Sequence, residues 1–177
     1  VGAYLGLSSL NRATTHLAGK TMDTVSTAAE LRSLLGEYRI SSYRGLTRAS
    51  EAVKQDARKQ SADLAARIEA TSADFAKLAT TPEERKLQEQ FAEAWTTAKA
   101  SYDSVNEMVD LELPDDAVDT FLGETAQLHD GAYALVGEMI KRADEQANAA
   151  GARADSAYTA SGSLIVIMLL AGIGGGL

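Results

Sequence analysis

The sequence predicts an all-α protein and, within that class, an up-down-up-down antiparallel four-helix bundle. Its 177 residues include only two prolines and are rich in Ala, Leu and Glu, a composition that favours helices. Apolar side chains recur at spacings of three and four along most of the chain, as on one face of an amphipathic helix. The helix breakers leave two outer segments of about 45 residues and two inner segments of about 30. A bundle whose outer helices continue beyond the inner pair has this pattern of lengths.

The first helix is expected over residues 4–47. Gly45 and the short polar side chains that follow Arg44 place its end near Thr47. A helix of this length spans about 65 Å, since each residue adds about 1.5 Å. Its apolar stripe consists of Leu10, Leu17, Ala28, Leu31, Leu35 and Tyr38, with Val25 and Leu46 alongside.

The second and third helices are expected over residues 49–79 and 82–111. In the turn between them, Thr81 is the N-cap, Pro82 the first helical residue and Glu84 the residue three places after the cap. This arrangement is a capping box, which marks the start of a helix. The two apolar stripes consist of Val53, Ala57, Leu64, Ile68, Phe75 and Leu78, and of Leu87, Phe91, Ala94, Ala98, Tyr102, Val105 and Val109.

The fourth helix is expected over residues 115–160. Pro114 follows Leu113 and precedes a fresh apolar pattern, so the third helix should end near Leu111. The stripe of the fourth helix consists of Phe121, Leu128, Ala132, Leu135, Met139 and Ala143. Each of the four helices therefore has one apolar face, as a bundle requires.

The two ends of the chain differ from the middle in charge. Residues 163–177 read SLIVIMLLAGIGGGL and contain no charged residue, as expected for the start of a transmembrane helix. Residues 1–7, VGAYLGL, are also uncharged and are expected to form the end of an earlier transmembrane segment. The bundle, residues 8–160, would then leave one face of a membrane and return to it.

Composition argues against several kinds of function. The net charge of -8 at pH 7 argues against a nucleic-acid surface, which needs clustered positive charge. The chain has no cysteine, and its two histidines, His16 and His129, lack the spacing of a helical metal site, so we expect no metal and no other cofactor. No nucleophile and base lie at helical spacing, so we do not expect an enzyme.

Two arginines interrupt the apolar side of the first helix. Arg32 and Arg39 lie one heptad apart, about 20° from each other on the helical wheel, in line with Val25 and Leu46. An unpaired guanidinium facing the core would be strongly destabilising, so an anion is expected beside each of them. Acids of neighbouring helices are one source of that anion, and extension of the side chains into solvent is another solution.

The layer at the height of these arginines is expected to be neutral and polar. Counting from the predicted tips selects residues 57–64, 96–103 and 123–130 of the other helices. The side chains expected there are Gln60, Ser61, Ser101, Tyr102 and Thr125, with His129 on a flank and the nearby acids, Asp130 among them, toward the outside. Two guanidiniums without an inward acid predict a bound carboxylate, a di- or tricarboxylate that both side chains can reach.

The layout resembles the four-helix-bundle sensor domain of bacterial chemoreceptors, the methyl-accepting chemotaxis proteins. The resemblance covers essentially the whole chain and includes the segment LRSLLGEYRISSYR in the distal half of the first helix and the TPEE turn between the second and third. It implies a homodimer in the inner (plasma) membrane, with a periplasmic sensor domain that binds a small organic acid or an amino acid. The resemblance places the ligand at Arg32 and Arg39, with Tyr43, Tyr102 and Thr125 as partners.

The same resemblance implies signalling without chemistry. Ligand binding would bias the position of the fourth helix, and the second transmembrane segment would carry that bias to a cytoplasmic signalling domain. The ligand site lies either within one bundle or between two protomers. Two other interpretations remain open, the input domain of a membrane histidine kinase and a membrane-anchored structural bundle without a ligand.

Overall fold

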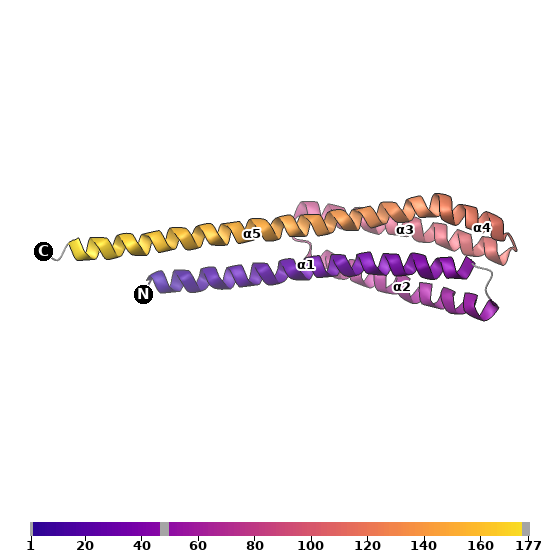
Figure 1. Cartoon of the computed structure of the whole chain (residues 1–177), viewed down its shortest axis with the longest axis horizontal. Coiled ribbons are helices and arrows are strands. Elements are labelled where there is room, and N and C mark those ends of the chain that lie inside the picture. The colour runs from indigo at the N-terminus through magenta and orange to yellow at the C-terminus, as the bar shows by residue number, and fades with distance from the viewer. Residues whose placement is uncertain (1, 47–49, 175–177) are drawn as a thin grey trace. The chain divides into compact units, whose positions relative to one another are not determined.

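The structure, a computed structural model, is helical along almost its whole length (Figure 1). It describes the backbone of residues 2–46 and 50–174, and the side chains of residues 19–46, 50–149 and 151–152. The elements are α1 (Gly2–Leu46), α2 (Glu51–Leu78), α3 (Pro82–Asp110), α4 (Pro114–Thr120), the π-helical segment η1 (Phe121–Thr125) and α5 (Ala126–Gly174). No strand occurs in the ranges for which the backbone is described. The predicted all-α four-helix bundle is confirmed.

The chain divides into two compact units, which we describe separately. Residues 23–142 form one unit, in which α1, α2, α3 and the continuous run α4–η1–α5 follow one another in alternating directions (Figure 1). Residues 1–22 and 143–177 form the other unit, which contains the first part of α1 and the last part of α5. The fourth helix of the bundle is therefore three consecutive elements rather than one uniform helix.

The sequence signals for the turns are largely confirmed. The Thr81 hydroxyl accepts a hydrogen bond from the Glu84 amide at 3.2 Å, and the Glu84 carboxylate accepts one from the Thr81 amide at 2.9 Å. This reciprocal pair is the predicted capping box, and Pro82 begins α3 as expected. Pro114 likewise begins α4, after a turn in which Glu112 adopts a φ of 60°. The turn predicted near Thr47 falls on residues 47–49, which lie outside the described residues.

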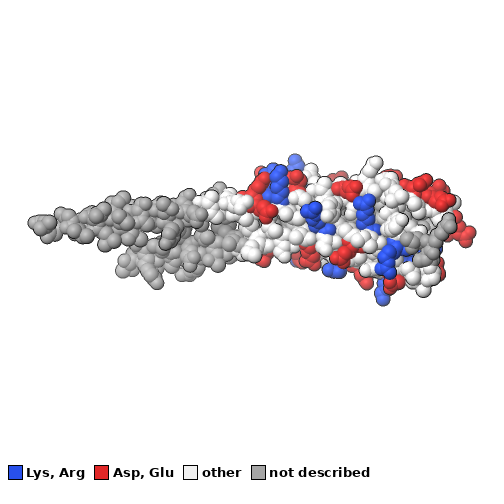
Figure 2. Space-filling model, in the orientation of Figure 1, with Lys and Arg blue, Asp and Glu red and all other residues white. Residues whose placement is uncertain are grey.

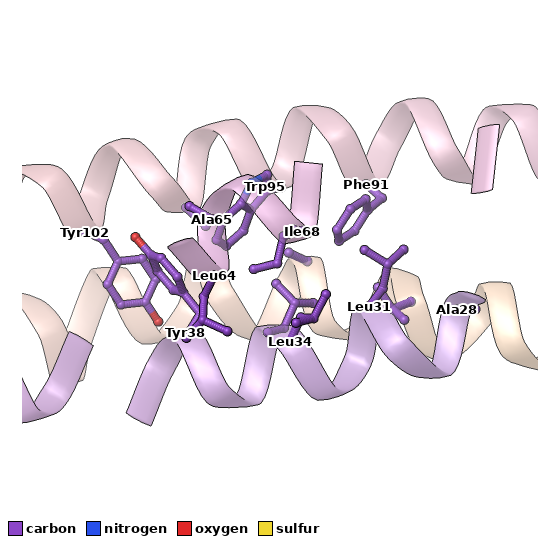
Figure 3. Packing of buried hydrophobic residues seen from close by; sticks show 14 of the residues in the cluster. Ala28, Leu31, Leu34, Tyr38, Leu64, Ala65, Ile68, Phe91, Trp95 and Tyr102 are labelled. Atoms are coloured by element: carbon purple, nitrogen blue, oxygen red, sulfur yellow. The ribbon is translucent and has the colours of Figure 1, made fainter. Parts of the chain in front are cut away.

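The core of the bundle is aromatic and aliphatic (Figure 3). The predicted stripe residues that are fully buried are Ala28, Leu31, Leu35, Tyr38, Ala57, Leu64, Ile68, Phe75, Phe91, Ala98, Tyr102, Val105, Phe121, Ala132, Met139 and Ala143. The prediction was wrong for Val53, which is exposed. It also omitted Leu34 and Trp95, which are buried in the same core.

Charged side chains of both signs lie on the visible face of the described residues (Figure 2). Acidic side chains gather over the end at which α4 lies, where Asp110, Glu112, Asp115, Asp116 and Asp119 are all exposed. Mixed surface charge of this kind keeps each ion close to water, so individual surface ion pairs contribute little to stability.

The two predicted transmembrane segments are not tested by the structure, because the side chains of residues 1–7 and 163–177 lie outside the described residues. A search of the residues that are described finds no helix with the combined length and apolarity of a membrane span.

Candidate functional site

Arg32 lies on the exposed face of α1 and reaches across to α5. Its Nε donates a hydrogen bond to the hydroxyl of Tyr133 at 2.8 Å, and its guanidinium carbon lies 4.9 Å from the centre of the same ring. Both contacts use the delocalised, planar cation, which stacks on aromatic rings as well as donating hydrogen bonds. Arg32 forms no ion pair with any carboxylate of the described residues.

Arg39 lies one heptad further along α1 and is paired with an acid. Its Nη1 lies 2.9 Å from the Oδ1 atom of Asp130 on α5. Asp130 lies toward the outside, as expected, but Arg39 reaches it there, so the expectation that no acid of the bundle meets the arginines was wrong for Arg39. Both side chains are partly in water, with 38% of the Arg39 side chain and 65% of the Asp130 side chain exposed. The argument that an unpaired guanidinium is buried in the core therefore does not hold, because neither arginine is buried.

Arg32 and Arg39 on α1, together with Asp130 and Tyr133 on α5, define a polar strip that we call the α1–α5 seam. Tyr133 was not predicted, because the residues of the fourth helix expected at the height of the arginines ended at residue 130. A window wider by one turn would have found it.

A buried polar pair lies next to the seam. The Tyr102 hydroxyl of α3 and Nδ1 of His129 of α5 are joined by a hydrogen bond of 3.1 Å, and His129 is only 2% exposed. The expectation that His129 lies on a flank was therefore wrong. Burial, the largest cause, and the positive charge of Arg39 together lower the pKa of His129 to about 4, although the charge of Asp130 opposes both. His129 is accordingly neutral at pH 7.

The same surroundings keep Tyr102 protonated. Burial raises its pKa well above the usual range, and the positive charge of Arg39 only partly opposes this effect. Tyr102 also packs edge-to-face against Tyr38 and Phe121, with ring centres 4.9 and 5.6 Å apart. The two side chains that we predicted as ligand partners here, Tyr102 and His129, are thus part of the interior and bonded to each other.

The other predicted site residues are more dispersed. The Thr125 hydroxyl is fully buried and lies 2.6 Å from that of Ser101, so it joins η1 to α3. Gln60 lies on the other side of α1, where its Oε1 accepts hydrogen bonds from Ser41 and Arg44. The structure therefore does not bring Gln60 to the α1–α5 seam.

Tyr43 is 46% exposed on α1, and its ring centre lies 5.6 Å from that of Phe121. It is closer to the distal end of the bundle than Arg39. Tyr43 contributes an exposed aromatic edge to α1 rather than a group bonded to the seam.

The π-helical segment explains why His129 faces inward. Ala117, Phe121, Thr125 and His129 are all buried at intervals of four residues. In a regular α-helix, each step of four residues carries the side chain about 40° round the axis, so the last would leave the core face. The wider turn of η1 absorbs part of this drift. As a result Leu128, a predicted core residue, is only half-buried.

The site offers no arrangement for a metal ion. Within the part of the chain whose side chains are described, no group of three His, Asp or Glu side chains is placed to hold one. The seam offers the hydrogen-bond donors of two guanidiniums, together with one phenol hydroxyl and the carboxylate of Asp130, which already accepts from Arg39.

Comparison with known proteins identifies the fold family. Residues 1–158 match the family described as four helix bundle sensory module for signal transduction. The chain belongs to this family of sensory modules. A comparison with curated proteins found no match. The sensory module is a chemoreceptor-type sensor domain, and a sensor domain is a non-enzymatic kind of domain.

Proposed function

We propose that this sensory module binds a small di- or tricarboxylate at the α1–α5 seam and transmits the binding event along α5. The observation that carries the proposal is Arg32, an exposed guanidinium one heptad from Arg39 that forms no ion pair with a described carboxylate. One of its N–H groups donates a hydrogen bond to the Tyr133 hydroxyl. The two oxygens of a carboxylate are well placed to accept hydrogen bonds from the others.

The exposed pair between Arg39 and Asp130 supplies a mechanism. An ion pair this exposed contributes about 0–1 kcal/mol, so a ligand carboxylate that binds both arginines can displace Asp130 at little cost. Displacement replaces a direct link between α1 and α5 with a link through the ligand. The two helices then favour a different relative position in the bound state, which is the differential interaction that a signal requires.

We also propose the setting in which this signal acts. Residues 1–7 and 163–177 would be membrane-inserted, the bundle periplasmic, and the receiving partner a cytoplasmic signalling domain. The uncharged run from Ser163 to Leu177 supports the insertion. A homodimer through α1 is supported by Ile40 and Tyr43, which are exposed on that helix although they are large and mainly apolar.

The dimer is testable by cysteine crosslinking, since the native chain contains no cysteine. Ile40→Cys should form a disulfide-linked dimer under mild oxidation, whereas Lys77→Cys, at an exposed position of α2, serves as the matched control. Equal crosslinking of both variants, or none for Ile40→Cys, would exclude this dimer face.

Ligand binding is tested by thermal unfolding with succinate, malate and citrate. A ligand at 100 times its dissociation constant should stabilise the module by about 2.7 kcal/mol. Arg32→Ala and Arg39→Ala should remove this stabilisation, and Arg67→Ala, an exposed arginine of α2 that lies 4.0 Å from Glu30, should keep it. Retention by both seam variants would remove the site.

The Arg39–Asp130 ion pair is also compatible with a structural bundle that binds no ligand. The variant Asp130→Asn distinguishes the two possibilities. If Asp130 competes with the ligand, the variant should bind the carboxylate up to about five times more tightly, the equivalent of about 1 kcal/mol. A structural bundle predicts no acid binding in either form. An input domain of a histidine kinase would bind in the same way, and its output domain alone would distinguish it.

A further inference from the structure

Tyr133 makes two different contacts with Arg32, and together they fix the guanidinium. The Tyr133 hydroxyl accepts a hydrogen bond from Nε of Arg32 at 2.8 Å, and the ring centre lies 4.9 Å from the guanidinium carbon. An exposed arginine otherwise samples many rotamers, because its side chain has several rotatable bonds. A hydrogen bond and a ring contact at the same time hold the planar group in one orientation.

The Tyr133 ring is held in turn by the interior of the bundle. It is half-buried and packs against the core cluster. One turn earlier on α5, the His129 ring stacks on it, with ring centres 6.3 Å apart and an angle of 24° between the planes. His129 is 2% exposed and is joined to the Tyr102 hydroxyl at 3.1 Å, so it has little freedom to move. The exposed guanidinium is therefore connected through two rings of α5 to a buried phenol of α3.

The orientation of Arg32 decides which of its N–H groups face a ligand. A guanidinium carries five N–H groups, one on Nε and two on each terminal nitrogen. A carboxylate can form two parallel hydrogen bonds with it from the side, through Nε and one terminal nitrogen, or from the end, through both terminal nitrogens. Because Nε of Arg32 is bonded to Tyr133, only the end approach still offers two donors.

We propose that Tyr133 and His129 are positioning residues that present only the two terminal nitrogens of Arg32 to the ligand. This inference rests on the proposed carboxylate function of the seam. Tyr133 acts on Arg32 directly, whereas His129 acts only through the Tyr133 ring. The arrangement increases affinity because the arginine is already ordered before the ligand arrives.

The orientation is tested first without a ligand, by NMR of the arginine Nε–H groups in the intact protein. The Arg32 signal is the one that disappears in Arg32→Lys. Its exchange with water should be about fivefold slower than that of Arg67, whose contact with Glu30 is 4.0 Å long. Tyr133→Phe keeps the ring and removes the acceptor, so exchange should become about fivefold faster, whereas Tyr43→Phe should leave it unchanged. An unchanged rate in Tyr133→Phe overturns the proposal.

Two variants at His129 separate positioning from folding. His129→Leu removes the ring that stacks on Tyr133, so the Nε–H of Arg32 should exchange about threefold faster. His129→Phe lacks the bond to Tyr102 but keeps a flat ring, and it should restore slow exchange. A general loosening of the core would instead accelerate exchange in both variants, in proportion to their loss of thermal stability. Equal rates in the two variants overturn the role of His129.

Binding is then measured by titration calorimetry with succinate, malate and citrate. Tyr133→Phe should bind the acid about fivefold more weakly than the native chain, because the ligand must now order Arg32 itself. The side approach that opens in this variant doubles the number of binding modes and recovers only about a factor of two. Tyr43→Phe should bind normally.

Unchanged binding by Tyr133→Phe overturns the proposal. If none of the three acids binds the native protein, the carboxylate function of the seam fails, and the exchange rates alone decide whether Tyr133 and His129 position Arg32.

Discussion

The α1–α5 seam and the interior around Phe91 differ in how much water reaches their contacts. Phe91 is fully buried among side chains of the core cluster, whereas Arg39 and Asp130 meet at the surface. When a side chain in a close-packed apolar core moves, many contacts are lost together. In an exposed ion pair, by contrast, either ion can exchange its partner for water or for another ion of the same charge. The seam is therefore the side at which the proposed ligand would act, and the core is the rigid part of the bundle that supports it.

The largest effect is expected in the core. Phe91→Ala should reduce the free energy of unfolding by about 3–5 kcal/mol, since it removes a buried ring and leaves a cavity. Urea unfolding followed by circular dichroism measures the change. Leu122→Ala removes an exposed apolar side chain and should stay within about 0.5 kcal/mol. Similar losses for the two variants would contradict the distinction between frame and surface.

His129 should make stability depend on pH. Its folded pKa of about 4 lies below the ordinary value of 6.5, so the unfolded chain binds more protons and acid favours unfolding. The contribution is complete above about pH 6.5 and is lost progressively as pH falls through the folded pKa. Between pH 7.5 and pH 5, we expect a loss of about 2 kcal/mol.

The matched measurement uses His129→Gln, which cannot titrate. Its stability should fall less over the same pH interval than that of the native chain, with the carboxylates common to both. Parallel curves for the two proteins would mean that water reaches His129 in the folded state.

A smaller effect is expected at the turn between α2 and α3. Thr81→Ala removes the capping hydroxyl and should lower stability by about 1 kcal/mol, because the Glu84 amide loses its acceptor. Thr97→Ala is the control, since its exposed hydroxyl bonds only a carbonyl one turn back in α3. Thermal unfolding of the pair measures the difference, and equal melting temperatures would show that the turn does not need its cap.

The smallest effect is expected at the seam. A double-mutant cycle of Arg39→Ala and Asp130→Ala should give a coupling energy of about 0.2–1 kcal/mol. The exposed pair Arg58–Asp110, between α2 and α3, provides a comparison of similar exposure. A coupling above about 2 kcal/mol for Arg39 and Asp130 would show that the seam is too strong to be displaced by a ligand.

Most of the fold was predictable because it follows from local signals. Thr81, Pro82 and Glu84 define one turn by side-chain chemistry alone, and Pro114 defines another. The inward face of the fourth helix was less predictable. Extrapolation at regular α-helical geometry selected Leu128, whereas the π-helical turn rotates the helix so that His129 is buried. No single residue of that turn signals its extra width.

The positions of the two arginines of the candidate site could be predicted from the sequence, but the residues around them could not. The spacing of Arg32 and Arg39 placed them on one side of α1, and in the structure both side chains contact α5. Their exposure depends on how deeply α1 sits against α5, which is a property of packing between helices. The pairing of Arg39 with Asp130 depends on the same packing and on the rotation at η1.

Tyr38 has a consequence for how α1 moves. It is the α1 ring that meets both Trp95 and Tyr102 of α3, in each case with its plane nearly perpendicular to its neighbour's. Interlocked rings of this kind do not slide smoothly, because intermediate positions bring edges into collision and open gaps. We therefore expect α1 to move in a jump between two packed positions, so that the proposed ligand would produce an all-or-none response and not a graded one.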